Sequence, residues 1–219
     1  MMFADRCDAG RRLAARLQHL RDCDPVVLAL VRGGLPVAYE VATALSAPLD
    51  VVLVRKLGAP RQPELAIGAV VDGDRPEIVT NPGVMRMVGA SDIDVEAAAG
   101  RQLVEIERRR TLYLGHRAQV DVRGRTAIVV DDGIATGATT RAALHAVRRR
   151  QPSRLVLAVP VAPSDTLADL AAEADEIVCL DTPDPFGAVG AFYRDFRQVS
   201  DAEVVDLLDR AREGRQAGP

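Results

Sequence analysis

Residues 127–140 read AIVVDDGIATGATT, and this stretch says most about the fold. Four apolar residues precede two acids, Asp131 and Asp132, and a turn rich in glycine and threonine follows. An apolar run without alternation is typical of a strand covered on both faces of a sheet. A Gly- and Thr-rich turn is typical of the entry into a helix. The stretch therefore predicts a strand, a loop and a helix in succession.

The same alternation continues on both sides of this stretch. Further strands are expected at 26–31, 51–54, 155–161 and 177–180, with helices at 36–46, 139–150 and 165–174. Strands that alternate with helices form right-handed βαβ units. We therefore expect an α/β fold with a doubly wound, mainly parallel sheet.

The remaining segments complete one predicted domain over residues 1–213. A helix is expected at 5–21, a Gly- and Pro-rich lid or small hairpin at 57–81, and a hood with a C-terminal helix at 181–213. Ser91 with Asp94, and Ser200 with Glu203, have the spacing of a capping box, which predicts a long helix at 91–114 and the start of the C-terminal one. Residues 214–219 are expected to be a frayed tail.

Composition excludes several classes of function. The 219 residues carry 28 Lys and Arg against 31 Asp and Glu, and the net charge of −3 gives no reason to expect a nucleic-acid partner. The sequence has no apolar run near the ~20 residues that cross a bilayer and no signal-peptide pattern, so we expect a cytoplasmic protein without a membrane partner. The three cysteines lack metal-ligand spacing.

Lys56 is the only lysine, because the other 27 of the 28 basic residues are arginine. Such a bias is typical of a GC-rich genome, and chance could have left one lysine. A compact ammonium differs chemically from a planar guanidinium, however, so the position is a candidate for a site that requires lysine.

The loop in residues 127–140 has the chemistry of a phosphate site. A turn at a helix N-terminus presents free backbone N–H groups to an anion, here from Ala135 through Thr140. Thr136, Thr139 and Thr140 can add hydroxyl donors, and Gly137 permits close approach. Asp131 and Asp132 cannot bind phosphate, so they suggest a sugar diol or Mg²⁺ beside it. An ordinary Asp-Asp-Gly turn is the structural alternative, whereas Walker A and dinucleotide-binding glycine patterns are absent.

The stretch resembles the phosphoribosyl pyrophosphate (PRPP) signature of type I phosphoribosyltransferases at every position of that pattern. Residues 31–36, VRGGLP, resemble the pyrophosphate loop of the family, in which a strained, often cis, peptide such as Arg32–Gly33 turns N–H groups toward the leaving group. Arg55-Lys56 is similar to an Arg-Lys pair that contacts pyrophosphate. Nearly the whole chain resembles a bacterial group of phosphoribosyltransferases with an unassigned acceptor.

The resemblance implies transfer of 5-phosphoribosyl from PRPP to a small, nucleobase-like nitrogenous acceptor with release of pyrophosphate. Arg32, Gly33, Gly34, Arg55 and Lys56 would bind pyrophosphate. Asp131 and Asp132 would hold the ribose hydroxyls and, largely through water and PRPP, Mg²⁺ as the cofactor. The segment after Leu57 would close over the site, and a homodimer is expected because dimers are usual in the family.

Three points stay open in the sequence. Ala135 stands where 6-oxopurine members carry an acidic base, which disfavours hypoxanthine and guanine and leaves Glu64 as the candidate base. Phe186, Phe192 and Tyr193 could stack on the acceptor or simply pack in the core. A PRPP-sensing regulator that uses the Arg108–Arg110 and Arg148–Arg150 clusters, and an enzyme acting on a non-nucleobase amine, are the alternative functions.

Overall fold

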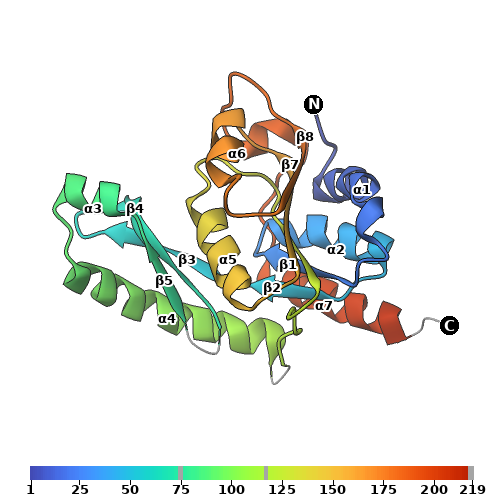
Figure 1. Ribbon diagram of the computed structural model, residues 1–219, viewed down its shortest axis with the longest axis horizontal. Helices are drawn as coiled ribbons and strands as arrows, with labels where there is room; N and C mark the ends of the chain where they lie inside the picture. The colour runs from blue at the N-terminus through green and yellow to red at the C-terminus, as the bar shows by residue number, and fades with distance from the viewer. Residues whose placement is uncertain (74–75, 116–117, 217–219) are drawn as a thin grey trace.

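The computed structural model describes residues 1–73, 76–115 and 118–216, apart from the side chains of Glu64, Arg215 and Gln216 (Figure 1). Its main sheet has five parallel strands in the order β2–β1–β6–β7–β8. These strands are β1 (Pro25–Leu30), β2 (Leu49–Val52), β6 (Thr126–Val130), β7 (Arg154–Val161) and β8 (Glu176–Asp181). The predicted α/β fold with a mainly parallel sheet is confirmed.

Helices cover both faces of this sheet (Figure 1). One face carries α1 (Arg6–Arg16), α2 (Gly34–Leu45) and α7 (Asp201–Gln216), and the other carries α5 (Ala138–Arg149) and α6 (Ser164–Leu170). Every residue of β1 and β6 is buried, because alternate side chains enter the two cores. The uninterrupted apolar runs in the sequence are explained by this double coverage.

The strand order reverses between β1 and β6, and this reversal positions the site. From β1 the chain crosses to β2 on one side, and it later returns to place β6 on the other side of β1. In open α/β sheets, ligands bind outside the carboxyl ends of the strands at such a switch point. The loops after Leu30 and Val130 meet there.

Residues 54–73 and 76–114 form an arm that projects from the main sheet (Figure 1). Strands β3 (Val54–Ala59), β4 (Gln62–Val71) and β5 (Glu77–Thr80) form a separate antiparallel sheet, with α3 (Pro82–Val88) and α4 (Asp92–Leu114) beside it. The predicted strand at 51–54 is therefore wrong at its end, because β2 stops at Val52 and β3 starts a different sheet. Of the two expectations for 57–81, the structure has the hairpin.

Capping explains where α4 and α7 begin. The Ser91 hydroxyl accepts from the Asp94 amide at 3.3 Å, and the Asp94 carboxylate accepts from the Ser91 amide at 2.8 Å. Ser200 and Glu203 repeat this reciprocal pair before α7. Both predicted helix starts are confirmed. Helix α7 continues to Gln216, three residues beyond the predicted end at 213, and residues 217–219 of the expected frayed tail lie outside the described residues.

Two short 3₁₀ turns complete the set of elements. The predicted helix at 5–21 ends earlier than expected, because α1 stops at Arg16 and the 3₁₀ turn η1 (Gln18–Leu20) follows. The second turn, η2 (Val189–Phe192), precedes a bridge between Phe3 and Tyr193, which brings the first residues of the chain beside the segment before α7. The single domain over 1–213 stays a prediction.

Candidate active site

The loop between β6 and α5 leaves the first turn of α5 open. Gly137 precedes α5 with φ 72°, a left-handed conformation that favours glycine, and no side chain caps the amides of the first turn. Ala135, Thr136 and Thr139 are exposed on this loop, whereas the Thr140 side chain is buried. The expected hydroxyl donors are therefore Thr136 and Thr139, while Thr140 offers its backbone amide.

Helix α6 supports the loop from outside. The Thr166 hydroxyl donates to the Ala135 carbonyl at 2.9 Å. A Cβ at Gly137 would be 3.0 Å from the Thr166 methyl group, so the helix packs tightly against the turn. The loop is thus held by contacts that leave its amides available, which is the arrangement that binds a phosphate group at a helix N-terminus.

The two acids at the end of β6 are partly buried. The Asp131 carboxylate accepts from the Asp132 amide at 2.9 Å. Burial, together with the neighbouring charge of Asp132, raises the pKa of Asp131 well above its usual value. Burial also raises the pKa of Asp132, although the Arg6 guanidinium opposes that rise.

Arg6, which sequence reasoning did not single out, pairs with Asp132. Its Nε donates to Asp132 Oδ2 at 2.7 Å, and the two side chains are 10% and 13% exposed. The Tyr193 hydroxyl donates to the Asp132 carbonyl at 2.5 Å. Arg6 is the first residue of α1, where a cation is unfavourable to the helix dipole, and this mismatch is the sequence signal that could have identified it.

The loop after β1 contacts the acids directly. A Cβ at Gly33 would be 2.2 Å from Asp132 Oδ2, and one at Gly34 would be 2.7 Å from the Val130 carbonyl oxygen. Only glycine allows this approach at either position. The cis peptide is Val31–Arg32, so the expected position at Arg32–Gly33 is wrong by one residue. Arg32 points toward α7, where it donates to Asp201 Oδ1 at 3.5 Å.

Arg55 and Lys56 lie within β3, and they line a cavity of about 710 Å³ together with Thr139. The strand expected at 51–54 would end just before this pair, whereas the structure has the pair inside a strand of the antiparallel sheet; the cavity joins the pair to the phosphate loop through Thr139. Arg101 and Gln102 of α4 also line it, and none of the described lining residues carries a carboxylate. Gln102 Oε1 accepts from Arg55 Nε at 2.9 Å.

Sequence reasoning missed the contribution of α4 to this cavity. Val95, Ala98, Ala99 and Ile106 form the buried face of α4, and Gln102 interrupts it at helical spacing. A polar residue within an apolar helix face is the signal that could have been used. The pKa of Arg55 is lowered by burial and by the nearby Arg109 charge, which shows that positive charge is concentrated here.

The predicted acceptor aromatics separate into two roles. Tyr193 is 6% exposed and packs between Phe3 and Phe196, with ring centroids at 5.3 and 5.0 Å. Its ring is therefore part of the core. Phe186 and Phe192 are partly exposed and stack on each other at 5.2 Å. Glu64 belongs to β4, and its side chain lies outside the described residues.

Comparison with known proteins agrees with this geometry. Residues 5–197 match the profile of the phosphoribosyl transferase domain. The chain belongs to the phosphoribosyltransferase family. It is 51% identical, over 99% of its length, to a Mycobacterium tuberculosis protein named "Putative phosphoribosyl transferase". The Thermus thermophilus protein TT1426, a crystal structure, is 46% identical and has a TM-score of 0.82 over 95% of this chain and 98% of that one.

A more distant solved structure shares only the fold. The Aquifex aeolicus protein AQ2163 has a TM-score of 0.50 at 12% identity, over 84% of this chain and 78% of that chain. The chain spans about half the length of the curated relatives it matches, since the alignment covers 49% of the M. tuberculosis protein. Within residues 1–73, 76–115 and 118–216, no helix is long and apolar enough to cross a membrane.

Two neighbouring acids, Asp131 and Asp132, are the candidate metal ligands of this site. Among the residues that the structure describes, no group of three or more His, Cys, Asp or Glu side chains could enclose a metal ion. Asp131 and Asp132 are adjacent oxygen donors at the mouth of the site. Magnesium is commonly held by one or two carboxylates together with substrate phosphates and water, so this donor set fits a metal that arrives with its substrate.

Proposed function

We propose that this phosphoribosyltransferase transfers the 5-phosphoribosyl group of PRPP to a small, nucleobase-like nitrogenous acceptor and releases pyrophosphate. The observation that carries the proposal is the order of three features along the loop after β6 and the cavity beside it. Two partly buried acids and an uncapped helix N-terminus follow β6, and a cavity lined by Arg55 and Lys56 reaches Thr139 at the start of α5. These groups suit a sugar that carries phosphate at one end and pyrophosphate at the other.

The phosphate end of the substrate binds to the start of α5. The amides from Ala135 to Thr140 and the hydroxyls of Thr136 and Thr139 donate to its oxygens. Because the Thr166 hydroxyl holds the Ala135 carbonyl by a hydrogen bond, the conformation of the loop changes little when phosphate binds. This end of the site provides binding and orientation rather than chemistry.

The sugar lies over Asp131 and Asp132. In the reaction the bond from C1 to the pyrophosphate oxygen breaks and a bond from C1 to the acceptor nitrogen forms, with inversion. The ribosyl group gains positive charge in between, and carboxylates that accept from its hydroxyls stabilise that charge. Partial burial of both acids strengthens this electrostatic effect, because little water screens it.

The departing pyrophosphate lies in the cavity beside β3. Arg55, Lys56 and Arg101 give that cavity positive charge. Gln102 orients Arg55 through its 2.9 Å hydrogen bond. The amides after Val31 complete the leaving-group site, and the β3–β4 hairpin excludes water that would otherwise hydrolyse PRPP.

Magnesium is the proposed cofactor because the two carboxylates fit a metal carried in by the substrate. When bound, Mg²⁺ would neutralise negative charge on the pyrophosphate. Asp131 and Asp132 would hold it, largely through water and the sugar hydroxyls. The protein side chains then contribute orientation at the sugar and cationic charge at the leaving group.

The acceptor site is proposed near Phe186 and Phe192, whose stacked rings are partly exposed. An aromatic face favours a planar, nucleobase-like acceptor. Ala135 provides no carboxylate at the position used by 6-oxopurine members, so adenine-like or pyrimidine-like acceptors are favoured over hypoxanthine and guanine. Glu64 remains the proposed base, and unchanged turnover in Glu64→Gln would overturn that role.

The test measures pyrophosphate released from PRPP and Mg²⁺ across a panel of nucleobases and amines. Release that requires one acceptor class and is lost in Asp131→Asn supports the proposal. Exposed Asp22 gives a matched control, since Asp22→Asn should keep full activity. PRPP binding without release under any condition would instead support a PRPP sensor, and absence of PRPP binding by calorimetry would overturn both functions.

A homodimer in the cytoplasm, acting in nucleotide metabolism, is proposed with this activity. Light scattering on the purified chain tests the dimer directly, and a monomeric mass would overturn it. The two Arg clusters support no nucleic-acid role, because Arg108 and Arg109 pair with Glu105, while Arg148 pairs with Asp175. These pairs reduce the positive charge available to a phosphate backbone.

A further inference from the structure

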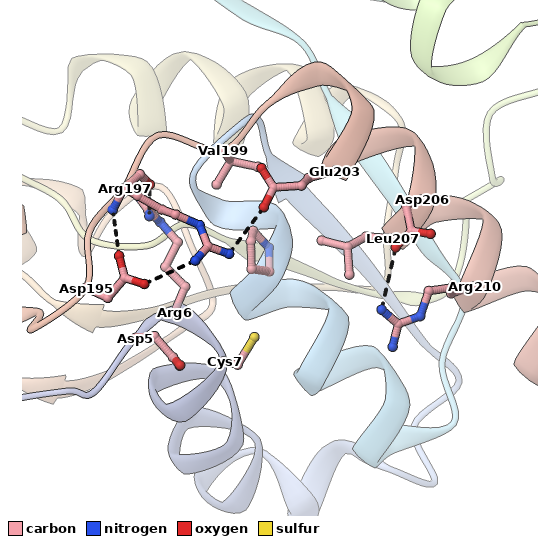
Figure 2. Close-up of a pocket in the computed structure, with 11 residues that line it drawn as sticks. Asp5, Arg6, Cys7, Asp195, Arg197, Val199, Glu203, Asp206, Leu207 and Arg210 are labelled. Carbon is pink, nitrogen blue, oxygen red and sulfur yellow. Dashed lines mark hydrogen bonds and ion pairs between the residues drawn. The ribbon is translucent and has the colours of Figure 1, made fainter.

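The Arg6 side chain is buried and makes more contacts than a surface arginine usually does. Besides its bond to Asp132, its terminal Nη1 donates to the Arg197 carbonyl at 2.8 Å. Its guanidinium carbon lies 3.9 Å from the ring centroid of Phe196, a cation–π distance. In Figure 2 the Arg6 side chain runs from the start of α1 toward the segment that carries Arg197. The residue is 9% exposed.

Backbone hydrogen bonds between Phe3 and residues 192–194 join the two segments that surround Arg6. The Phe3 amide donates to the Phe192 carbonyl at 2.8 Å, and the Arg194 amide donates to the Phe3 carbonyl at 2.9 Å. Tyr193, whose hydroxyl holds the Asp132 carbonyl, packs on both Phe3 and Phe196. Arg6 and Tyr193 thus belong to one packed cluster, in which Arg6 contacts the Asp132 side chain and Tyr193 contacts the Asp132 backbone.

The Asp132 carboxylate is confined between Arg6 and Gly33. Oδ2 accepts from Arg6 Nε, and the same oxygen occupies the space that a Cβ at Gly33 would need. A carboxylate held from two sides has few rotamers available, so its orientation is set before the sugar binds. A buried carboxylate without a cation would also be strongly disfavoured, and Arg6 supplies that cation.

We propose that Arg6 is a positioning residue for the sugar-binding acid Asp132. It contacts no substrate atom in this inference, which rests on the proposed function; it fixes the carboxylate that accepts from the ribose hydroxyls. Groups that orient a residue of the site in this way are commonly worth roughly 10- to 100-fold in ligand affinity or activity.

A small cavity makes the inference testable by chemical rescue. About 230 Å³ of space borders Arg6, lined in part by Cys7, Pro36 and Leu207 (Figure 2). Guanidinium can therefore reach the position vacated by Arg6→Ala. Arg12→Ala is the matched control, because Arg12 lies on the same helix, pairs with Asp8 at 2.8 Å and stacks on Phe3, but it has no contact with Asp132 among those described.

The experiment compares binding of ribose 5-phosphate and inorganic phosphate by calorimetry. Wild type should bind the sugar phosphate more tightly, and Arg6→Ala should lose roughly 10- to 100-fold of that affinity while its phosphate affinity stays unchanged. Millimolar guanidinium chloride should restore sugar binding to Arg6→Ala, raise its kcat without a change in the KM for the acceptor, and leave Arg12→Ala unaffected. Arg6→Lys should retain intermediate affinity.

Each outcome has a separate meaning. If wild type binds ribose 5-phosphate and Arg6→Ala binds it equally well, Arg6 is not a positioning residue although the proposed function stands. If wild type shows no preference for ribose 5-phosphate over phosphate, the proposed function fails first and the inference fails with it. If circular dichroism shows that Arg6→Ala does not fold, Arg6→Lys is tested instead. If Arg6→Lys binds ribose 5-phosphate with wild-type affinity, and guanidinium does not change that affinity, the inference is overturned.

Discussion

The α-carbon of Gly33 lies directly against the carboxylate of Asp132, so closely that a Cβ would be 2.2 Å from Oδ2. The loop after β1 therefore meets the loop after β6 through the Asp132 carboxylate. The contact couples the proposed leaving-group loop to the proposed sugar-binding acid, and a change in either must displace the other.

Gly33→Ala should lower kcat/KM for PRPP by about 100-fold, because a shift of about 1 Å in a reacting group has an effect of that size. Steady-state pyrophosphate release measures it. Gly187→Ala is the control, since a Cβ at Gly187 meets nothing within 4 Å. Equal activity in both variants would mean that the contact does not position the acid.

Lys56→Arg should keep the fold and the charge but lower kcat/KM by roughly 10- to 100-fold, the value of one hydrogen bond to a charged group. The planar guanidinium is longer than the ammonium and cannot follow a moving pyrophosphate as a compact charge does. Arg61→Lys, at the exposed turn of the same hairpin, should retain full activity. If Lys56→Arg has wild-type kinetics, the single lysine is explained by codon usage and not by a requirement for an ammonium group.

Arg101→Gln should weaken pyrophosphate binding by roughly tenfold, because one charge-assisted contact is lost from the cavity beside β3. Product inhibition by pyrophosphate gives the affinity. Arg110→Gln, on the same helix and paired with Glu107 at 3.9 Å, is the comparison variant. A similar loss in both would indicate a general charge effect instead of a contact.

Asp131→Asn should abolish turnover and raise the melting temperature at pH 7 by a few degrees. In a chain of this size, a change of about 1 kcal/mol in the free energy of unfolding shifts the melting temperature by roughly 2–4 °C. Since the folded pKa of Asp131 is raised, its contribution to stability is full below about pH 4, where the unfolded carboxyl titrates, and is lost as pH rises through the folded pKa. The difference from wild type should therefore shrink toward pH 4. Calorimetric melting across this range would contradict the claim if the two curves were parallel.

Tyr113 should ionise near pH 12. Burial and the hydrogen bond to Asp201 at 2.5 Å raise its pKa to about 12, so its contribution to stability is complete below about pH 10 and is lost between there and pH 12. Phenolate absorbance should show this step in wild type and not in Tyr113→Phe. An unchanged absorbance curve in the variant would assign the step to another tyrosine.

The sequence was most informative where local patterns and tertiary packing agree. Apolar runs such as 127–130 predicted the parallel sheet, because burial on both faces leaves no room for alternation. Ser91 and Ser200 predicted two helix starts, because capping is a local interaction. The loop at 135–140 could be proposed as a phosphate site from the sequence, since its amides and hydroxyls come from consecutive residues.

Contacts between distant residues could not be predicted in the same way. Arg6 and Asp132 are separated by 126 positions, and their pairing depends on how α1 packs against the end of β6. The arm was predicted only as a lid or a hairpin, because glycines and prolines interrupt its strands. The sequence therefore did not predict that Arg55 and Lys56 lie in a separate antiparallel sheet. The role of Tyr193 could not be predicted, because its ring packs in the core while its hydroxyl donates to the Asp132 carbonyl.

The backbone pairing of Phe3 with residues 192 and 194 has a consequence for biosynthesis. A chain emerges from the ribosome with its N-terminus first, so the strand that carries Asp131 and Asp132 is made long before the segment that frames Arg6. Asp131 and Asp132 therefore acquire these surroundings only after residues 192–197 have been translated.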